Sequence, residues 1–398
     1  MAFPVKWYSN AMQGAPSLGD TTEGALASLL KAVLVTGFGN LTVNSLSWDA
    51  ALGWAVATID AGHSYLKDSV IAINGASPSG YNGEHRVMKV SATKVWFELD
   101  GGNPGSSATG TISIKIPGLG WVITHESANG QVFIVRSPES VDAYPVSLRI
   151  ENSAFSGWSS GSGNTGYLAK VAMVEDVADL DTYTLIIEHR WPATGRYSDK
   201  RWDLVGDNLL FYFAPAYALG NLQAIYTFGY INSVRPGDRY HCILNTYRGT
   251  SAADVNRSWA VYGVSNSSYY NFFATHLNTV DRYLARAYHQ VFGTVSWQTI
   301  GLFSRMGTGL PLPNPADNGF YLATDPTMVM ESVSSALRGY LPGLINPYSD
   351  IAAYASKNFN ALPSLAGRAV RFWRVTFAES SFGSGPTLVG FDITGPWR

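Results

Sequence analysis

One stretch of the chain, VEDVADLDTY, concentrates carboxylates. It holds Glu175, Asp176, Asp179 and Asp181. Carboxylates at this density could share a Ca²⁺ ion, although the spacing and the glycine of an EF-hand loop are absent. Glu175 and Asp179 could instead form the acid pair of a glycosidase, in which two carboxyl groups flank the sugar bond. A solvated loop between two strands explains the same residues without any ligand, and this is the interpretation that we favour.

Other residue types that carry chemistry are scattered. The histidines lack the helical spacing with an intervening glutamate that a zinc protease needs. They are His63, His85, His125, His189, His241, His276 and His289. The glycine-rich segment Gly161 to Gly166 lacks the lysine and the preceding buried parallel strand of a phosphate-binding loop, so we interpret it as a flexible loop. We therefore predict no catalytic residue, no metal site and no bound cofactor.

Aromatic residues give a stronger signal in bulk. Several lie beside polar, turn-rich segments, where a fully buried ring is less expected. They are Trp191, Tyr197, Trp202, Tyr269, Tyr270, Phe272 and Phe273. Exposed tryptophan and tyrosine side chains are typical of protein interfaces and of platforms that stack sugars. Three hypotheses stay open for these rings: a protein interface, burial in the core, and a carbohydrate-binding surface.

The composition favours a folded β protein that associates with other proteins. The chain has 398 residues, 46% of them hydrophobic, so it can bury a core and form two or three domains. Charged residues make up 14%, whereas the chain holds 40 Gly, 22 Tyr, 18 Phe and 12 Trp, a balance typical of sheets and tight turns. The net charge of −2 supplies no attraction for nucleic acid or an anionic membrane, and we exclude both as partners.

The single cysteine and the first residues bear on where the protein is made. Cys242 lies in a predicted strand and has no second cysteine to pair with, so we expect a buried thiol. The opening MAFPVKWYSN lacks the features of a signal peptide. No apolar run reaches the length of about 18 residues that a membrane span requires. We expect synthesis and assembly in a cytoplasm.

The elements that position these residues begin with an extended arm and a helix, residues 1–40. Asp20 is a suitable N-cap, Glu23 completes a capping box, and apolar residues keep helical spacing until Gly37. The apolar face of this helix docks either on the rest of the chain or on another subunit. The candidate docking residues are Trp7, Tyr8, Leu26, Leu30 and Trp397.

The remaining chain predicts a mainly β fold in two parts. Short alternating runs at residues 54–59, 69–73, 85–90, 94–99 and 111–116 predict a small N-terminal β-sandwich or barrel, residues 41–117. Pro117-Gly118 marks the boundary. Residues 118–398 then form a large antiparallel β-sandwich-like region, either a single domain or two packed β sub-domains.

Within the large region, apolar and aromatic runs predict the strands. They lie at residues 121–125, 131–136, 146–151, 183–190, 209–214, 222–231, 240–244 and 368–377. The turn Arg235-Pro236-Gly237-Asp238 separates two of them. Residues 280–292 and 328–337 suit either a helix or a strand, and we favour strands. Arg338 to Leu344, RGYLPGL, is predicted to break the pattern.

Several segments together resemble a known family. They are Lys6-Trp7-Tyr8, Gly14-Ala15-Pro16, Thr36-Gly37-Phe38-Gly39, Asn82-Gly83-Glu84-His85-Arg86-Val87, Gly120-Trp121, Val205-Gly206-Asp207, Phe228-Gly229-Tyr230-Ile231, Pro236-Gly237-Asp238, Arg338 to Leu344 and Asp392 to Arg398. In this order the chain resembles structural proteins that tailed bacteriophages encode among their tail and baseplate genes. The shared motifs are turns and strand starts rather than active-site patterns.

The resemblance implies a virion structural protein, made in the host cytoplasm and not an enzyme. Its partners would be copies of itself and other tail or baseplate proteins, joined through broad aromatic β interfaces. The first alternative is a receptor- or glycan-binding tail tip protein that uses the aromatic residues named above. The second is a tailspike-like glycan depolymerase that uses Glu175 and Asp179.

Overall fold

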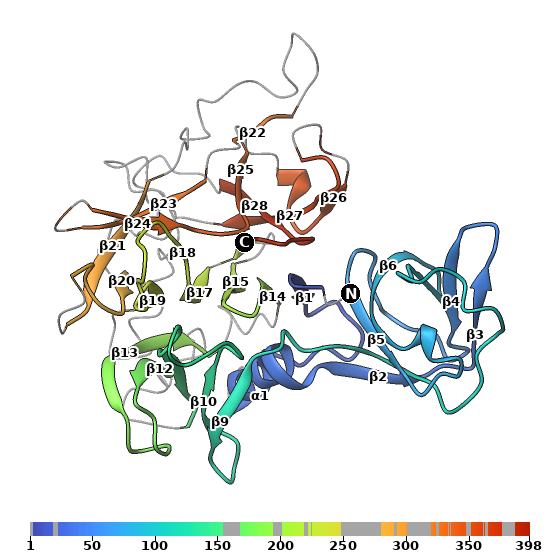
Figure 1. Ribbon diagram of the computed structural model, residues 1–398, viewed down its shortest axis with the longest axis horizontal. Coiled ribbons are helices and arrows are strands. Elements are labelled where there is room, and N and C mark those ends of the chain that lie inside the picture. Colours follow the sequence, from blue (N-terminus) through green and yellow to red (C-terminus); the bar gives the residue numbers. More distant parts are fainter. Residues whose placement is uncertain are drawn as a thin grey trace.

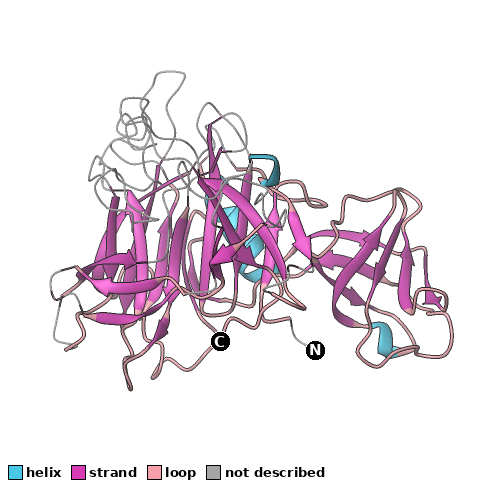
Figure 2. Cartoon of the chain, turned by 90° about the horizontal axis from the view of Figure 1, so that it is seen from above, coloured by secondary structure: helices cyan, strands magenta, loops and turns pink. Residues whose placement is uncertain are grey.

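The computed structural model describes most of the chain. The described residues are 3–18, 23–153, 168–193, 201–218, 222–223, 225–247, 280–289, 293–300, 320–323, 326–332, 334, 336–347, 352–360, 362, 365–375 and 387–398. They form a mainly β molecule with a small barrel-like part beside a larger body (Figures 1 and 2). The predicted fold class is thereby confirmed.

Seven antiparallel strands build the small part, which we call the small barrel. They are β2 (Phe38–Thr42), β3 (Ser45–Asp49), β4 (Trp54–Thr58), β5 (Val70–Asn74), β6 (Gly83–Val90), β7 (Lys94–Phe97) and β8 (Ser113–Ile116), with a 3₁₀ turn η2 (Ser79–Tyr81). Their order is β2-β8-β5-β6-β7-β4-β3. The end strands β2 and β3 are consecutive in the chain. Ala108 N–H, in the segment between β7 and β8, donates to the Leu46 carbonyl of β3 at 2.8 Å and links that segment to the end strand.

A long antiparallel sheet forms the framework of the large body. Its strands are β1 (Lys6–Ser9), β9 (Val122–Glu126), β10 (Val132–Arg136), β11 (Ser147–Glu151), β12 (Leu168–Glu175), β13 (Thr184–Pro192), β14 (Trp202–Gly206), β15 (Leu210–Ala218), β17 (Tyr226–Tyr230) and β19 (Cys242–Tyr247). The strands β9 to β13 pair in chain order, and the sheet then continues β13-β19-β17-β15-β14-β1. The first strand of the chain therefore joins the large body.

The later strands first extend this sheet, because residues 280–284 pair with β19, and then form a second layer of the large body. They are β16 (Leu222–Gln223), β18 (Asn232–Ser233), β20 (Val280–Leu284), β21 (Val295–Ile300), β22 (Leu322–Ala323), β23 (Met328–Glu331), β24 (Leu337–Tyr340), β25 (Leu344–Pro347), β26 (Asn358–Asn360), β27 (Ala369–Val375) and β28 (Thr387–Asp392), with a 3₁₀ turn η4 (Ala352–Tyr354). Rings interlock between the layers: Tyr212 lies 4.9 Å from Phe391, which lies 4.3 Å from Trp373. These contacts make the body sandwich-like.

The helix begins later than the sequence predicts. Helix α1 (Ala25–Lys31) continues into a π turn, η1 (Ala32–Thr36), and Asp20 lies outside the described residues. The Asn152 side-chain oxygen, far along the chain, accepts the N–H groups of Leu26 and Ala27 at 2.9 and 3.3 Å. Because that oxygen satisfies the first helical donors, a residue of β-sheet origin caps the helix instead of a local capping box.

Strand β1 joins the small barrel to the large body. Its backbone pairs with β14, and its side chains bond residues outside the large sheet. Lys6 Nζ bonds Glu84 of β6 at 2.7 Å, the Trp7 indole donates to the Asp68 carbonyl at 2.9 Å, and the Tyr8 hydroxyl donates to the Pro117 carbonyl at 3.0 Å. The barrel is therefore held by buried hydrogen bonds as well as by chain connectivity.

Most predicted strands of the small barrel and large body are confirmed. The five barrel runs match β4 to β8, and the residues 121–136 form the expected β9–β10 hairpin. Strands β20 and β23 begin the two ambiguous segments, so the choice of strand is confirmed there. The prediction of a break at residues 338–344 is wrong in part, because β24 includes Arg338 to Tyr340. The domain boundaries 1–40, 41–117 and 118–398 stay predictions.

Cys242 is fully buried, as predicted, and burial raises the pKa of its thiol well above the usual value. Among the described residues, no helix is both long and apolar enough to cross a membrane.

Candidate functional site

An open pocket of about 450 Å³ lies on the large body. One wall comes from β18 and the following turn, another from the loop that holds Tyr144, and a third from Arg398. Arg235, Arg239, His241 and Arg398 all line the pocket. The cavity thus gathers basic side chains from distant parts of the sequence.

The predicted turn at residues 235–238 forms the floor of this pocket. Gly237 has φ +69°, which only glycine adopts readily, and Asp238 N–H donates to the Arg235 carbonyl at 3.3 Å. The Ser233 hydroxyl accepts the Arg235 N–H at 3.1 Å, and an Asp238 carboxylate oxygen accepts the Tyr240 N–H at 3.2 Å. Side-chain hydrogen bonds on both sides therefore fix the position of the turn.

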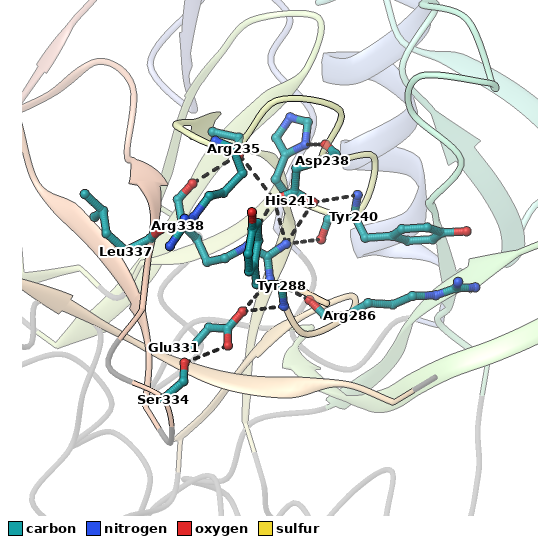
Figure 3. A network of polar contacts seen from close by, with 11 residues as sticks. Arg235, Asp238, Tyr240, His241, Arg286, Tyr288, Glu331, Ser334, Leu337 and Arg338 are labelled. Atoms are coloured by element: carbon teal, nitrogen blue, oxygen red, sulfur yellow. Dashed lines mark hydrogen bonds and ion pairs between the residues drawn. The ribbon is translucent and has the colours of Figure 1, made fainter. Parts of the chain in front are cut away.

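Beneath the turn lies a buried ionic network centred on Arg338 (Figure 3). The Arg338 guanidinium is fully buried and donates to both Asp238 oxygens at 2.7 to 3.0 Å and to Glu331 Oε1 at 2.7 Å. It also donates to the Arg286 carbonyl at 2.7 Å. Glu331 in turn accepts the Tyr288 N–H at 2.6 Å. This network joins β23 and β24 to the turn and to the end of β20.

Each charged group of this network is stable in the interior only while its partners are present. Burying three charged groups is costly, and the cost is offset only when each charge has close partners of opposite sign and further hydrogen bonds. Asp238 and Glu331 are 6% and 4% exposed, so removal of Arg338 would leave two carboxylates without water or a cation. The network therefore fixes the turn that forms the pocket floor.

The arginines of the pocket differ in their surroundings. Arg398 pairs with Asp207, at 3.0 Å between Nε and Oδ2, and is electrically balanced. The Arg235 guanidinium lies 4.1 Å from the centre of the Tyr288 ring and donates through Nε to the Leu337 carbonyl at 3.1 Å. Arg239 is exposed. Neither Arg235 nor Arg239 forms an ion pair with a residue that the structure describes.

His241 lines this pocket with a neutral imidazole ring. Burial lowers the pKa of its imidazole, so the ring is neutral at pH 7. Its Nδ1 contacts the carbonyl oxygen of Asp238, an acceptor, which places the ring proton on Nδ1. Edge contacts with Tyr230 and Tyr144, at 5.1 and 5.9 Å between ring centres, hold the ring plane. Nε2 is consequently left as a hydrogen-bond acceptor.

Two of the seven aromatic residues considered as a contact surface lie in the part of the chain that the structure describes. Trp191 and Trp202 are fully buried, and their indole N–H groups donate to the Asn245 and Pro16 carbonyls at 2.9 and 2.8 Å. For these two residues the hypothesis of burial in the core is confirmed, and a contact surface is excluded because their rings pack inside the chain. Tyr197, Tyr269, Tyr270, Phe272 and Phe273 lie outside the described residues.

The candidate docking residues dock within the chain. Trp7, Tyr8, Leu26 and Leu30 are buried in the main hydrophobic core. Of the two alternatives, docking on the rest of the chain therefore holds for these residues, and a seam with another subunit does not.

Trp397 is half-buried and packs on Gly343, where an added Cβ would lie 2.1 Å from the ring. Its indole N–H donates to the Asp392 carbonyl at 2.9 Å. The ring near the end of this sequence is thus docked on its own chain, as predicted.

The acid cluster divides between a strand end and a turn. Glu175 ends β12, is buried and pairs with Arg286. Asp179 is exposed and accepts the N–H groups of Asp181 and Thr182 at 2.8 and 2.7 Å, and the hydrogen bond from Asp181, followed by those from Thr182, lowers the pKa of its carboxyl. For the exposed Asp176, Asp179 and Asp181, the favoured solvated loop is confirmed.

This loop has a packing role. Val177, Leu180 and Tyr183 pack against the outer faces of β10 and β12, over Ile134 and Ala172. Strand β12 is therefore covered on both faces. In the part of the chain that the structure describes, no group of three or more histidine, cysteine, aspartate or glutamate residues is arranged to hold a metal ion.

Sequence reasoning missed the basic pocket and the network beneath it. The sequence predicts the turn at residues 235–238, but its arginines precede a strand and belong to no recognisable binding motif. A possible signal was Arg338 in the apolar surroundings LRGYLPGL, since a charge there requires a buried partner. No protein-family model and no curated protein sequence matches the chain.

Proposed function

We propose that this chain is a structural subunit of a tailed-bacteriophage tail or baseplate, assembled with copies of itself and with neighbouring virion proteins. The observation that carries the proposal is the junction at β1. One strand is paired into the sheet of the large body, and its side chains are bonded to the small barrel. A junction of this kind transmits load between two β units without a flexible linker, which is what a scaffold subunit needs.

The surfaces that we propose for assembly are formed by exposed aliphatic side chains and a strand edge. Exposed aliphatic side chains remain on the large body, among them Val122 on β9 and Leu185 on β13, 39% and 51% exposed. Strand β9 pairs with β10, and no other described strand covers its outer edge. An exposed edge strand with apolar side chains favours association with another chain.

The experiment is to purify particles of the phage that encodes the chain and to measure its copy number by quantitative mass spectrometry. The expected result is a fixed, multiple copy number per particle and a defined position in an electron-microscopy map. A chain that is absent from washed particles contradicts the proposal.

Self-association is tested on the purified chain by sedimentation. Val122→Asp and Leu185→Asp are expected to weaken the oligomer, whereas Leu52→Asp, at a similarly exposed residue of the small barrel, should not. A wild-type chain that stays monomeric at high concentration argues against the homo-oligomer.

The second candidate, a receptor- or glycan-binding tip protein, loses Trp191 and Trp202 as contact residues but gains support from the basic pocket. The depolymerase hypothesis loses its acid pair, because Glu175 is bound to Arg286 and Asp179 is held as a carboxylate by a turn.

A further inference from the structure

The basic pocket carries positive charge that the described residues do not neutralise. Asp238 faces it, but both of its oxygens are bonded to Arg338 below. Asp207 is likewise engaged by Arg398. Arg235 and Arg239 therefore remain as cations at the pocket wall without a carboxylate partner among the described residues. Charge of this kind attracts an anion.

The guanidinium of Arg235 is held in place rather than free to swing. Its face lies on the Tyr288 ring and its Nε is used by the Leu337 carbonyl, so the terminal nitrogens carry the remaining donors. A planar guanidinium that is fixed in this way matches two oxygens of a carboxylate, phosphate or sulfate. Since the side chain is already ordered, less entropy is lost when an anion binds.

The pocket also contains one group that needs a hydrogen-bond donor from the ligand. His241 Nε2 is an acceptor, because its proton is on Nδ1 and burial keeps the ring neutral. The carboxylate of an acidic peptide side chain offers acceptors only and leaves this nitrogen unsatisfied, whereas hydrogen phosphate offers a P–OH donor but no further hydroxyl groups. A ligand with hydroxyl groups beside its anionic group satisfies both sides.

We propose that this pocket binds an acidic saccharide, that is, a sugar unit with a carboxylate or phosphate group and free hydroxyls. The anionic group lies between Arg235 and Arg239, and a hydroxyl donates to His241 Nε2. The volume of about 450 Å³ accommodates one or two sugar rings. The proposal goes beyond the structural role above and does not depend on it.

The test uses the full purified chain and isothermal titration with matched probes. Galacturonate is compared with galactose, and glucose 6-phosphate with glucose and with inorganic phosphate. The acidic sugars are expected to bind, and each neutral sugar to bind at least tenfold more weakly. Arg239→Gln and Arg235→Gln are expected to lower the affinity about tenfold each, as for loss of a charge-assisted hydrogen bond. Lys94→Gln, which removes an exposed charge from the small barrel, should leave it unchanged.

Three results would overturn the proposal. Equal binding of acidic and neutral sugars, or of neither, removes the role of the arginines. Inorganic phosphate that binds as tightly as glucose 6-phosphate reduces the pocket to an anion site without sugar recognition. A tetraglutamate peptide that binds more tightly than the sugars identifies an acidic protein segment instead. Particle composition tests the structural role separately, so the two proposals can fail independently.

Discussion

The small barrel and the large body are stabilised in different ways. The barrel packs an apolar interior of side chains such as Ile73, Val95 and Phe97, all fully buried, and its strands are close in sequence. The large body buries arginines that connect segments far apart, as Arg338 does with Asp238 and Arg371 with Asp203. Strands that are close in sequence find one another without ion pairs. In a two-layer body whose segments are far apart in sequence, buried ion pairs fix how those segments align.

The largest effect is expected from removal of the central arginine. Arg338→Met leaves Asp238 and Glu331 buried without a cation, so the free energy of unfolding should fall by about 3–5 kcal/mol. Denaturant unfolding followed by tryptophan fluorescence measures the change. The matched control adds Asp238→Asn and Glu331→Gln to Arg338→Met and should restore much of the loss. A single variant within about 1 kcal/mol of the wild type would refute the role given to the network.

A smaller loss is expected where a distant side chain caps the helix. Asn152→Ala removes the oxygen that accepts the Leu26 and Ala27 N–H groups and should cost about 1–2 kcal/mol. Denaturant unfolding measures it, and Asn129→Ala, in the exposed β9–β10 turn, serves as the control. Equal effects of the two substitutions would show that Asn152 does not stabilise α1.

A substitution inside the barrel is expected to lower the free energy of unfolding by a similar or smaller amount. Ile73→Val deletes one methylene from a fully buried side chain, so the free energy of unfolding should fall by about 0.5–1.5 kcal/mol. The same measurement applies. If the loss equals that of Arg338→Met, then the contrast between an apolar barrel and an ionically connected body is wrong.

The smallest effect is a dependence on pH. Burial lowers the pKa of His63, His85 and His241 below the ordinary 6.5, so the unfolded chain binds protons that the folded chain does not. The histidines should therefore leave stability constant between about pH 7 and 8 and should lower it as the pH decreases through 6.5 and towards the lowered values. Thermal unfolding between pH 7.5 and 5 measures the slope, which His85→Asn should reduce. A stability that rises on acidification would contradict the pKa directions.

Much of the barrel could be predicted from the sequence because its strands alternate. Strands β2 and β3 were missed because they are mostly half-exposed and lie among glycine and polar residues. Strand β12 was missed for the opposite reason. It is buried on both faces, so LAKVAMVE shows no alternation that would mark a strand.

The site could not be predicted because its parts meet only in three dimensions. Asp238 and Arg338 are 100 residues apart, and Asn152 lies 126 residues beyond Leu26. Neither spacing produces a local pattern. Trp191 and Trp202 misled for a related reason: polar, turn-rich neighbours in sequence do not reveal that a ring turns inward to donate to a distant carbonyl.

The register of β1 has a consequence for biosynthesis. Lys6 pairs with Gly206, so after its synthesis β1 waits until the chain as far as β14 has followed before its partner exists. The small barrel, residues 38–116, contains all of its own strand partners and can complete its sheet in that interval. The order of synthesis thus places a finished barrel beside the still unpaired β1, and the arrival of β14 gives β1 its partner.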